Sequence, residues 1–555
     1  MALISRSIPT LLRGLSQSSD ALKRLDHAEI QDNANSEPVL GLTKRPGSEF
    51  VAQLLTEATM TTTTEGGVNS EETKARVFVI NKSVTENYVV MIPATQQSRT
   101  DALSQTIYGA DIRVFDFDGN EKKVHRPDIT TQSMSGFDSM TTGQYLFNPS
   151  FVSGQPLVAQ DKIKTMNIAD FTFIVNTDVK TEYEPLVTPG DITQAIVFFN
   201  QVSDKTTYTV TVDGVTATKN TASDDPLSTS TVAGSIKTTL DSGLSGFTIV
   251  QNGPVLHIKK TDNTDFSITA SDTQGNSQIT VVKDSVQRFT DLPVISPNGM
   301  VVEIKGDTTS NVDNYYVKFV TENGGTFEKG QWEETVKPAM RYKFNYGTMP
   351  HVLIQQADGD FRFSEADGTE YTIESLETAA TYDLTYSSST GVTITVTQTN
   401  HGLITNDQIS VRRVTGSLIT NIYSITKVND NSFTFTYASS TVSPQTNQNC
   451  KIGEVYTIPA WGERTVGDGI TAPDPSFINH KINNIFFFRN RLGFLSDDKV
   501  ILSKTSEFFD FFPETVTTVV DNDPIDISAS HTKVSILKNT ATVGKQLIVF
   551  SDETQ

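Results

Sequence analysis

The sequence has a single cysteine, no long hydrophobic run and no surplus of basic residues. With Cys450 alone among 555 residues, a disulfide within the chain and a cysteine-rich zinc site are both excluded. No window approaches the ~18 uninterrupted apolar residues of a membrane-spanning helix. Residues 1–12 lack the apolar core and cleavage site of a signal peptide. We therefore expect a protein without a membrane span that is made in a cytoplasm, stays soluble and gains stability from packing and assembly.

The charge balance is strongly acidic. The chain has 44 Lys and Arg against 65 Asp and Glu, a formal net charge of -21. Such a surface repels free nucleic acid, which excludes a protein that reads a DNA sequence. Two interpretations stay open. The chain is either an ordinary acidic protein or part of a conduit, where an acidic wall avoids the phosphate contacts that make DNA bind tightly.

The common catalytic motifs are also absent. The sequence contains no P-loop, no His-Glu-x-x-His and no Gly-x-Ser-x-Gly, so the usual signatures of nucleotide hydrolysis, zinc proteolysis and serine hydrolysis are missing. The histidines are scattered singly, at positions 27, 125, 257, 351, 401, 480 and 531. We expect no enzyme activity, no cofactor and no metal site.

Two short acidic segments resemble fragments of calcium loops. Asp116, Asp118 and Asn120 have the spacing of the first ligands of such a loop, but Gly119 comes one position too early and no closing Glu follows. We interpret this segment as a hairpin turn. The same interpretation applies to residues 358–360, Asp-Gly-Asp.

A denser acidic cluster consists of Asp521, Asp523 and Asp526. Two of these carboxylates could act as acid and base on a glycosidic bond. They could also hold Ca²⁺ or line a solvated or channel-facing turn. Spacing along the chain does not give separation in space, so we favour the turn and leave the role of the cluster open.

Basic residues near aromatic ones occur at two places. Lys44 and Arg45 precede Pro46, and Arg489 and Arg491 interrupt an aromatic run. A basic and aromatic patch can bind nucleic acid. However, two arginines two positions apart on one strand share a face. We therefore favour ion pairs to a neighbouring strand or subunit.

The composition and patterning predict a mainly β, multidomain protein. Ser, Thr, Val, Asp and Asn are abundant, which favours strands and turns, and 555 residues exceed one ordinary core. Asp118-Gly119 and Asp213-Gly214 predict two-residue hairpin turns, the first of type I′. Residues 232–244 predict one amphipathic helix, and residues 11–25 have near-helical apolar spacing.

These patterns divide the chain into six segments. They are 1–54, helix-containing; 55–195, β strands; 196–290, a small α+β insert; 291–379, a return to β strands; 380–452, an inserted small β module; and 453–555, β strands. Many short strands at regular spacing are typical of a sandwich or propeller.

A family likeness is carried by the run Ile-Phe-Phe-Phe-Arg-Asn-Arg-Leu-Gly-Phe-Leu-Ser at 485–496. This run resembles the nozzle proteins, or tail tubular proteins B, of short-tailed bacteriophages of the podovirus and autographivirus type. Further similar segments follow the family order: 1–5, 14–17, 41–46, 112–116, 119–122, 168–176, 297–299, 315–317, 348–351, 500–504, 508–513 and 521–526. The chain departs from the family where Gln17-Ser18-Ser19 replaces Gln-Gln-Pro, and the 380–452 module is an addition.

The resemblance implies a structural protein of the virion tail, assembled in the host cytoplasm. It implies a homo-hexameric ring below a dodecameric adaptor ring, with residues 1–54 facing the adaptor. Tail fibres dock near the junction, internal virion proteins are further partners, and double-stranded DNA passes without specific binding. The implied fold has β-propeller-like and platform β domains. The family-motif residues that we expect at structural or interface positions are Gly14, Ser16, Gln17, Lys44, Arg45, Pro46, Phe487, Arg489, Arg491 and Leu492.

Two other functions stay open from the sequence alone. The first is a tail-associated glycan hydrolase that uses Asp521, Asp523 and Asp526. The second is an adhesin that binds the host through the 380–452 module. We also expect residues 453–555 to pack against strands outside this sequence. An unclosed propeller leaves sheet edges exposed, and in the family a stretch like 547–550 continues into further strands.

Overall fold

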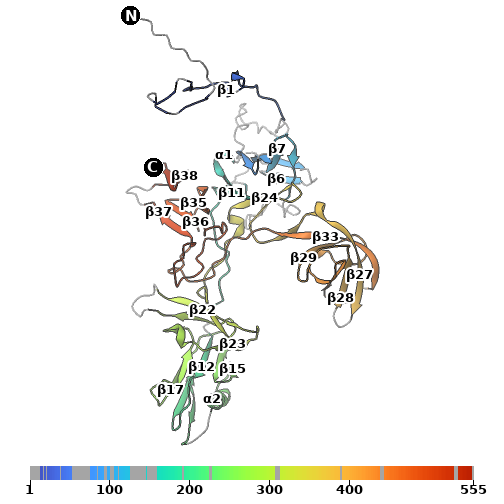
Figure 1. Ribbon diagram of the computed structural model, residues 1–555. Coiled ribbons are helices and arrows are strands. Elements are labelled where there is room, and N and C mark those ends of the chain that lie inside the picture. The colour runs from blue at the N-terminus through green and yellow to red at the C-terminus, as the bar shows by residue number, and fades with distance from the viewer. Residues whose placement is uncertain are drawn as a thin grey trace. The chain divides into compact units, whose positions relative to one another are not determined.

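The structure is a computed structural model in which strands predominate among the described residues (Figure 1). The mainly β, multidomain prediction is confirmed, whereas the propeller stays a prediction. No helix of the described residues is long and apolar enough to cross a membrane. The described residues are 13–16, 18–19, 22–24, 26–37, 39–52, 76–83, 86–92, 97–100, 106–109, 112–125, 145–146, 159–189, 193–223, 228–306, 313–387, 391–437, 443–529 and 535–552.

The N-terminal residues 1–56, together with 117–120, form a unit of their own. Its regular structure is a hairpin of β1 (Ala34–Glu37) and β2 (Gly41–Lys44). The described residues of the expected helix, such as Leu15 and Leu22, lie in a bridge and a turn instead. The helix prediction is wrong for them, because their side chains are 57% and 79% exposed and a short helix without packing is marginal.

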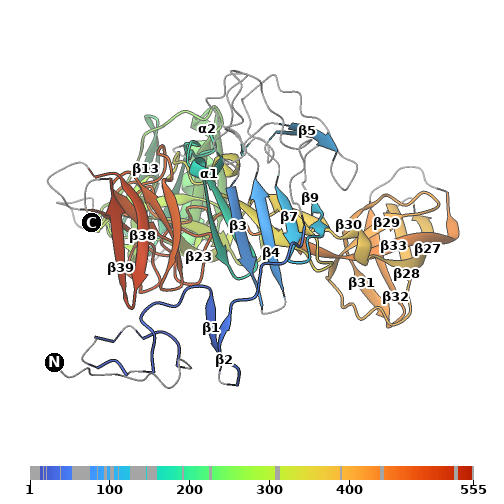
Figure 2. The same cartoon turned by 90° about the horizontal axis from the view of Figure 1, so that it is seen from above.

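One antiparallel sheet has the strand order β3-β4-β7-β8 (Figure 2). Its hairpin from β7 to β8 confirms a turn at residues 117–120. The predicted type I′ geometry is wrong, because that turn needs positive φ at both central residues and Gly119 has it (φ 86°) whereas Asp118 does not. The strands are β3 (Arg76–Asn81), β4 (Asn87–Ile92), β7 (Arg113–Asp116) and β8 (Glu121–Lys122), and a separate pair is β5 (Gln97–Thr100) with β6 (Thr106–Gly109).

Two sheets from distant parts of the chain share an aromatic core. The first has the order β10-β11-β24-β25-β9 and the second β34-β35-β36-β37. Phe173, Phe344, Trp461 and Phe494 are among the buried side chains of this core. The bounds are β9 (Val124–His125), β10 (Ile163–Ile168), β11 (Phe171–Asn176), β24 (His351–Gln355), β25 (Phe361–Ser364), β34 (Asn484–Phe488), β35 (Arg491–Ser496), β36 (Lys499–Leu502) and β37 (Ile525–Ser528), and the short helix α1 (Ala159–Lys162) precedes β10.

The predicted helix at 232–244 is confirmed as α2 (Thr229–Gly243), which Ser228 caps by accepting from the Thr231 amide. The predicted hairpin turn at Asp213-Gly214 is also confirmed, with both residues at positive φ. Helix and strands enclose one apolar core. The strands are β12 (Gln194–Phe199), β13 (Thr207–Val212), β14 (Val215–Asn220), β15 (Phe247–Asn252), β16 (Val255–Lys260), β17 (Ile268–Asp272) and β18 (Ile279–Val282).

The next sheet has the order β19-β21-β22-β23-β20. Its pair β22–β23 is antiparallel, with Tyr316 opposite Thr335 and Thr321 opposite Gly330. The bounds are β19 (Ser285–Val286), β20 (Ile295–Pro297), β21 (Val301–Ile304), β22 (Tyr315–Thr321) and β23 (Phe327–Thr335).

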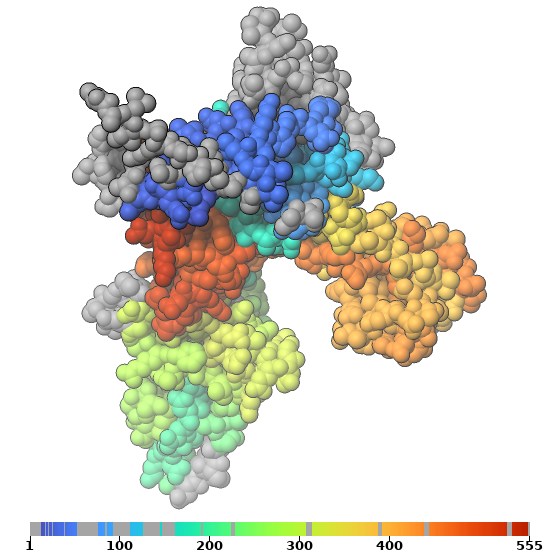
Figure 3. Space-filling view, turned by 45° about the horizontal axis from the view of Figure 1, so that its top comes forward, coloured from blue at the N-terminus to red at the C-terminus, as the bar shows by residue number. Residues whose placement is uncertain are grey.

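Residues 378–457 form a β module with an apolar core of its own, visible as one orange lobe in the space-filling view (Figure 3). Along β28, Val392, Ile394 and Val396 are buried and the threonines between them are not, as expected for strands with one face in a core. The strands are β27 (Thr378–Ser387), β28 (Gly391–Thr397), β29 (Gln408–Arg413), β30 (Asn421–Ser424), β31 (Thr426–Asn429), β32 (Ser432–Tyr437) and β33 (Gln445–Thr457). The preceding strand β26 (Glu370–Thr372) pairs with β33.

The last described hairpin pairs β38 (Leu537–Val543) with β39 (Gln546–Ser551). The predicted strand at 547–550 therefore lies within β39. The side chain of Leu537 is buried with Phe486 and Leu495 of the preceding sheet.

Candidate functional site

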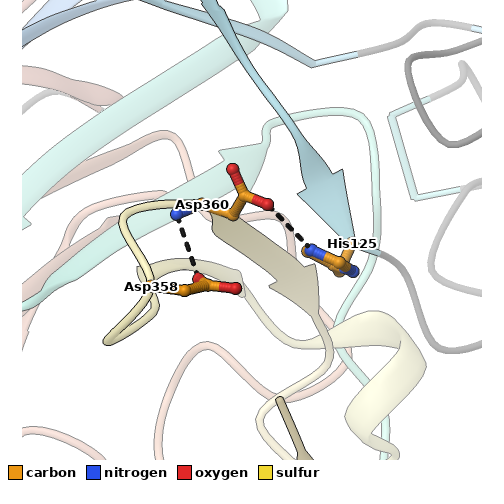
Figure 4. A group of neighbouring side chains, drawn as sticks. All are labelled: His125, Asp358 and Asp360. Carbon is orange, nitrogen blue, oxygen red and sulfur yellow. Dashed lines mark hydrogen bonds and ion pairs between the residues drawn. The ribbon is translucent and has the colours of Figure 1, made fainter. Parts of the chain in front are cut away.

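One group of metal-ligand side chains is brought together by tertiary structure. His125 lies on β9, and Asp358 and Asp360 lie in the turn between β24 and β25. β9 pairs with β25 in parallel, with His125 opposite Arg362. This pairing places the imidazole beside the turn (Figure 4).

The turn itself has the form that the sequence predicts. The Gln356 amide donates to the Asp360 carbonyl at 2.8 Å, the Gly359 amide donates to the Gln356 carbonyl at 3.0 Å, and Gly359 has a φ of 88°. The interpretation of residues 358–360 as a turn is confirmed. What the sequence did not reveal is the histidine beside it, which is 235 positions from Asp360.

The three side chains are close enough to bind one metal ion together. His125 Nε2 lies 3.4 Å from Asp360 Oδ2, and one ligand atom from each of the three residues lies within 4.8 Å of the others. The side chains of His125 and Asp360 are 32% and 24% exposed, so solvent ions reach them. Among the described residues this is the one such group.

The acidic cluster at 521–526 has a different organisation. The Arg491 guanidinium donates to the backbone carbonyl oxygens of Asp521, Asn522 and Asp523. Asp523 Oδ2 accepts from the Val520 amide at 2.9 Å. Among the described residues, the three aspartates do not form a group of mutually close metal-ligand atoms.

Asp526 makes a separate contact. Its Oδ2 atom accepts a hydrogen bond from the Ser476 amide at 2.7 Å. Asp526 belongs to the edge strand β37. The carboxylates of Asp523 and Asp526 therefore stabilise two different stretches of backbone.

The prediction that Arg489 and Arg491 share a strand face is wrong. β34 ends at Phe488 and β35 begins at Arg491, and Arg489 and Asn490 form the turn between them with φ of 48° and 58°. Arg489 Nη2 donates to the Lys545 carbonyl at 2.9 Å. Both arginines thus donate to backbone carbonyls, where we had expected ion pairs.

The other motif residues of this region lie in contrasting environments. Leu492 is fully buried in the aromatic core, so it is a packing residue. Phe487 is 37% exposed, and its ring contacts that of Phe508 edge-on, with 5.8 Å between ring centres.

Several motif residues of the N-terminal unit make backbone hydrogen bonds within that unit. The Ser16 amide donates to the Ala28 carbonyl, and the Ala28 amide donates to the carbonyl of Gly14, which has a φ of 69°. Lys44 ends β2, Arg45 donates from its amide to Asn33, and Pro46 follows in an exposed stretch. Gln17 lies outside the described residues. Interface roles for these residues stay predictions.

Comparison with known proteins places the chain in one family. All residues, 1–555, match the bacteriophage nozzle protein family. The chain is 25% identical over 562 aligned residues to tail tubular protein gp12 of Escherichia phage T7, an alignment that covers 100% of this chain and 53% of that protein. The chain therefore spans about half the length of this curated relative. On the strength of a match over its whole length, the chain belongs to the bacteriophage nozzle protein family.

Proposed function

We propose that the chain is a structural subunit of a short phage tail, one of six copies in a ring that forms the DNA ejection channel. The family match over residues 1–555 carries this proposal. A closed ring also suits a strand-rich chain, because cyclic assembly buries surface on every subunit equally.

The charge of the chain supports passage of DNA without binding. The chain has a formal net charge of -21, and each phosphate neutralised by Lys or Arg would strengthen binding and slow transit. The channel wall accordingly has more carboxylates than basic groups. No catalytic step is part of the proposal, so the subunit acts as a conduit.

The N-terminal unit is the proposed contact with the adaptor ring. It exposes several large apolar side chains: Leu22 (79%), Val39 (87%), Leu40 (68%) and Phe50 (80%). These side chains are the apolar surface that we propose the adaptor covers. Tail fibres and internal virion proteins are the further proposed partners.

The inserted module, residues 380–452, has a proposed role apart from the channel. Its strands enclose their own core, which supports a separately folded addition to the nozzle. Host binding through this module is the second candidate function. Deletion of the module from the virion distinguishes the two. A nozzle addition leaves adsorption intact, whereas an adhesin loses it.

A reconstruction of the virion tail tests the ring. We expect six copies of this chain around the axis, residues 1–54 against the adaptor and carboxylates on the channel wall. Another symmetry at this position contradicts the hexamer. A wall richer in Lys and Arg contradicts the proposed passage of DNA.

A further inference from the structure

We propose that His125, Asp358 and Asp360 bind one divalent transition-metal ion of the zinc type. The donor set is one imidazole nitrogen and two carboxylate oxygens. This mixture suits Zn²⁺, Co²⁺ and Ni²⁺ better than Ca²⁺ or Mg²⁺, which prefer oxygen ligands.

The spacing of the donor atoms fits a shared metal ion. His125 Nε2 and Asp360 Oδ2 are 3.4 Å apart, at the long end of hydrogen-bond distances, where ~2.7–3.2 Å is ordinary. Two ligands of a tetrahedral ion with bonds of ~2.0–2.1 Å lie about 3.3–3.4 Å apart. An ion placed between these two atoms therefore fits the observed separation, and Asp358 is close enough to supply the third ligand.

The local charge also favours a cation. Within the part of the chain that the structure describes, neither Asp358 nor Asp360 has a lysine or arginine ion-pair partner, and His125 is the one basic side chain paired with Asp360. Two carboxylates near each other repel when both are ionised. A divalent ion removes that repulsion and adds attraction to each carboxylate.

Outer hydrogen bonds orient the proposed ligands. The Lys123 amide donates to Asp360 Oδ1 at 3.4 Å. The Asp360 amide donates to Asp358 Oδ1 at 3.2 Å, and the Ser375 hydroxyl donates to Asp358 Oδ2. Such second contacts are typical of metal sites, where they hold the ligating carboxylates in place.

The metal would add a cross-link between β9 and the turn between β24 and β25, which the β9–β25 pairing already brings together. β9 has two residues and lies at the end of its sheet, where it pairs with β25. Ligands on both sides of this pairing tie the end strand to the turn between β24 and β25. Because the ion binds the folded chain, it stabilises the fold by an amount that grows with the logarithm of metal concentration.

The test is titration of the purified, chelator-treated 1–555 chain with ZnCl2 in a calorimeter. We expect one saturable site, weakened at least tenfold by His125→Ala and by Asp360→Asn. His480→Ala is the matched control. His480 Nδ1 lies 2.7 Å from Asp497 Oδ2 on an exposed surface, but among the residues that the structure describes His480 belongs to no group of three ligands. Unchanged affinity in His125→Ala, or an equal loss in His480→Ala, overturns the proposal.

Two further measurements separate binding from folding. Co²⁺ should give visible absorption bands in the wild-type chain that are lost in Asp360→Asn. Zn²⁺ should raise the thermal unfolding midpoint of the wild type and leave that of His125→Ala unchanged. If a variant has a lower midpoint but keeps the full zinc-dependent rise, the ion binds elsewhere and the proposal is wrong. Preference for Ca²⁺ over Zn²⁺ contradicts the zinc-type assignment.

Discussion

Arg491 donates a hydrogen bond from Nη2 to the backbone carbonyl oxygen of Asp521, at 2.8 Å. Its Nη1 atom donates to the carbonyls of Asn522 and Asp523 and, at 2.7 Å, to that of Ser503. Arg491 is buried, with 7% of its surface exposed. The acidic loop is thus organised around one guanidinium that binds its backbone.

Arg491→Lys is expected to destabilise the chain by about 2–4 kcal/mol. The planar guanidinium has five donors, whereas a lysine ammonium cannot reach four carbonyls from one position. The Ser503 carbonyl is buried and the other three are partly buried. A buried carbonyl that loses its donor costs about 1–3 kcal/mol, and a partly buried one costs less. Urea unfolding measures the change.

The control is Arg489→Lys, in the neighbouring turn. Arg489 donates one hydrogen bond, to the exposed Lys545 carbonyl, so we expect a loss below about 1 kcal/mol. Equal losses in the two variants would show that the four carbonyl contacts of Arg491 contribute no more to stability than the single contact of Arg489.

His351 makes stability depend on pH. Burial lowers the pKa of this fully buried imidazole to about 4, while its contact with the Met349 carbonyl opposes the shift. The unfolded chain has the ordinary histidine pKa of about 6.5 and therefore binds the proton first as pH falls. The stabilisation is complete above about pH 6.5 and decreases by roughly 3 kcal/mol as pH falls toward 4.

Unfolding free energies of the wild type and His351→Phe at pH 7 and pH 4.5 test this. We expect the wild type to lose more stability than the variant across this window, because carboxylates contribute equally to both. Phenylalanine keeps a flat ring against Tyr145, whose ring stacks on His351 with 4.0 Å between centres. Parallel profiles for wild type and His351→Phe would refute the assignment.

Arg412 and Glu377 join the β module to the chain that leads into it. Nε of Arg412 donates to Glu377 Oε2 at 2.9 Å, Nη2 donates to the same oxygen, and the Glu377 side chain is 1% exposed. Loss of the arginine leaves a buried carboxylate without its partner. We expect Arg412→Leu to cost about 2–4 kcal/mol.

The double variant Arg412→Leu with Glu377→Leu should recover at least half of that loss, since no charge is then left buried. Denaturant unfolding of the four chains of this cycle gives the coupling free energy. A double variant as unstable as the sum of the single ones would show that the two side chains act independently.

Cys450 is a built-in probe of the module. It is the single cysteine of the sequence, it is buried, and burial raises the pKa of its thiol to about 12. Because the thiolate is the reactive form, a disulfide reagent at pH 8 should leave the folded chain unmodified for as long as the module stays closed. The same reagent should label one thiol per chain in guanidinium. Rapid labelling of the folded chain would contradict a closed core.

The features that the sequence predicted correctly depend on residues a few positions apart. Asp213-Gly214 forms its turn because both residues tolerate positive φ, and α2 follows from apolar spacing after a serine cap. Two predictions were wrong in detail: the type I′ geometry of the turn at Gly119, and the shared strand face of Arg489 and Arg491. There the register of strand pairing sets the loop length and which residues the turn contains.

By itself the sequence determined the strand-rich composition, the acidic charge, the lack of a disulfide and the family likeness, all of which are properties of local pattern and residue content. Only the tertiary structure decided which distant side chains meet. His125 meets Asp360 because β9 pairs in parallel with β25, and Arg491 meets the 521–523 backbone because its hairpin packs beside that loop. Such contacts depend on how strands pair across hundreds of residues, and no periodicity within a short window encodes that pairing.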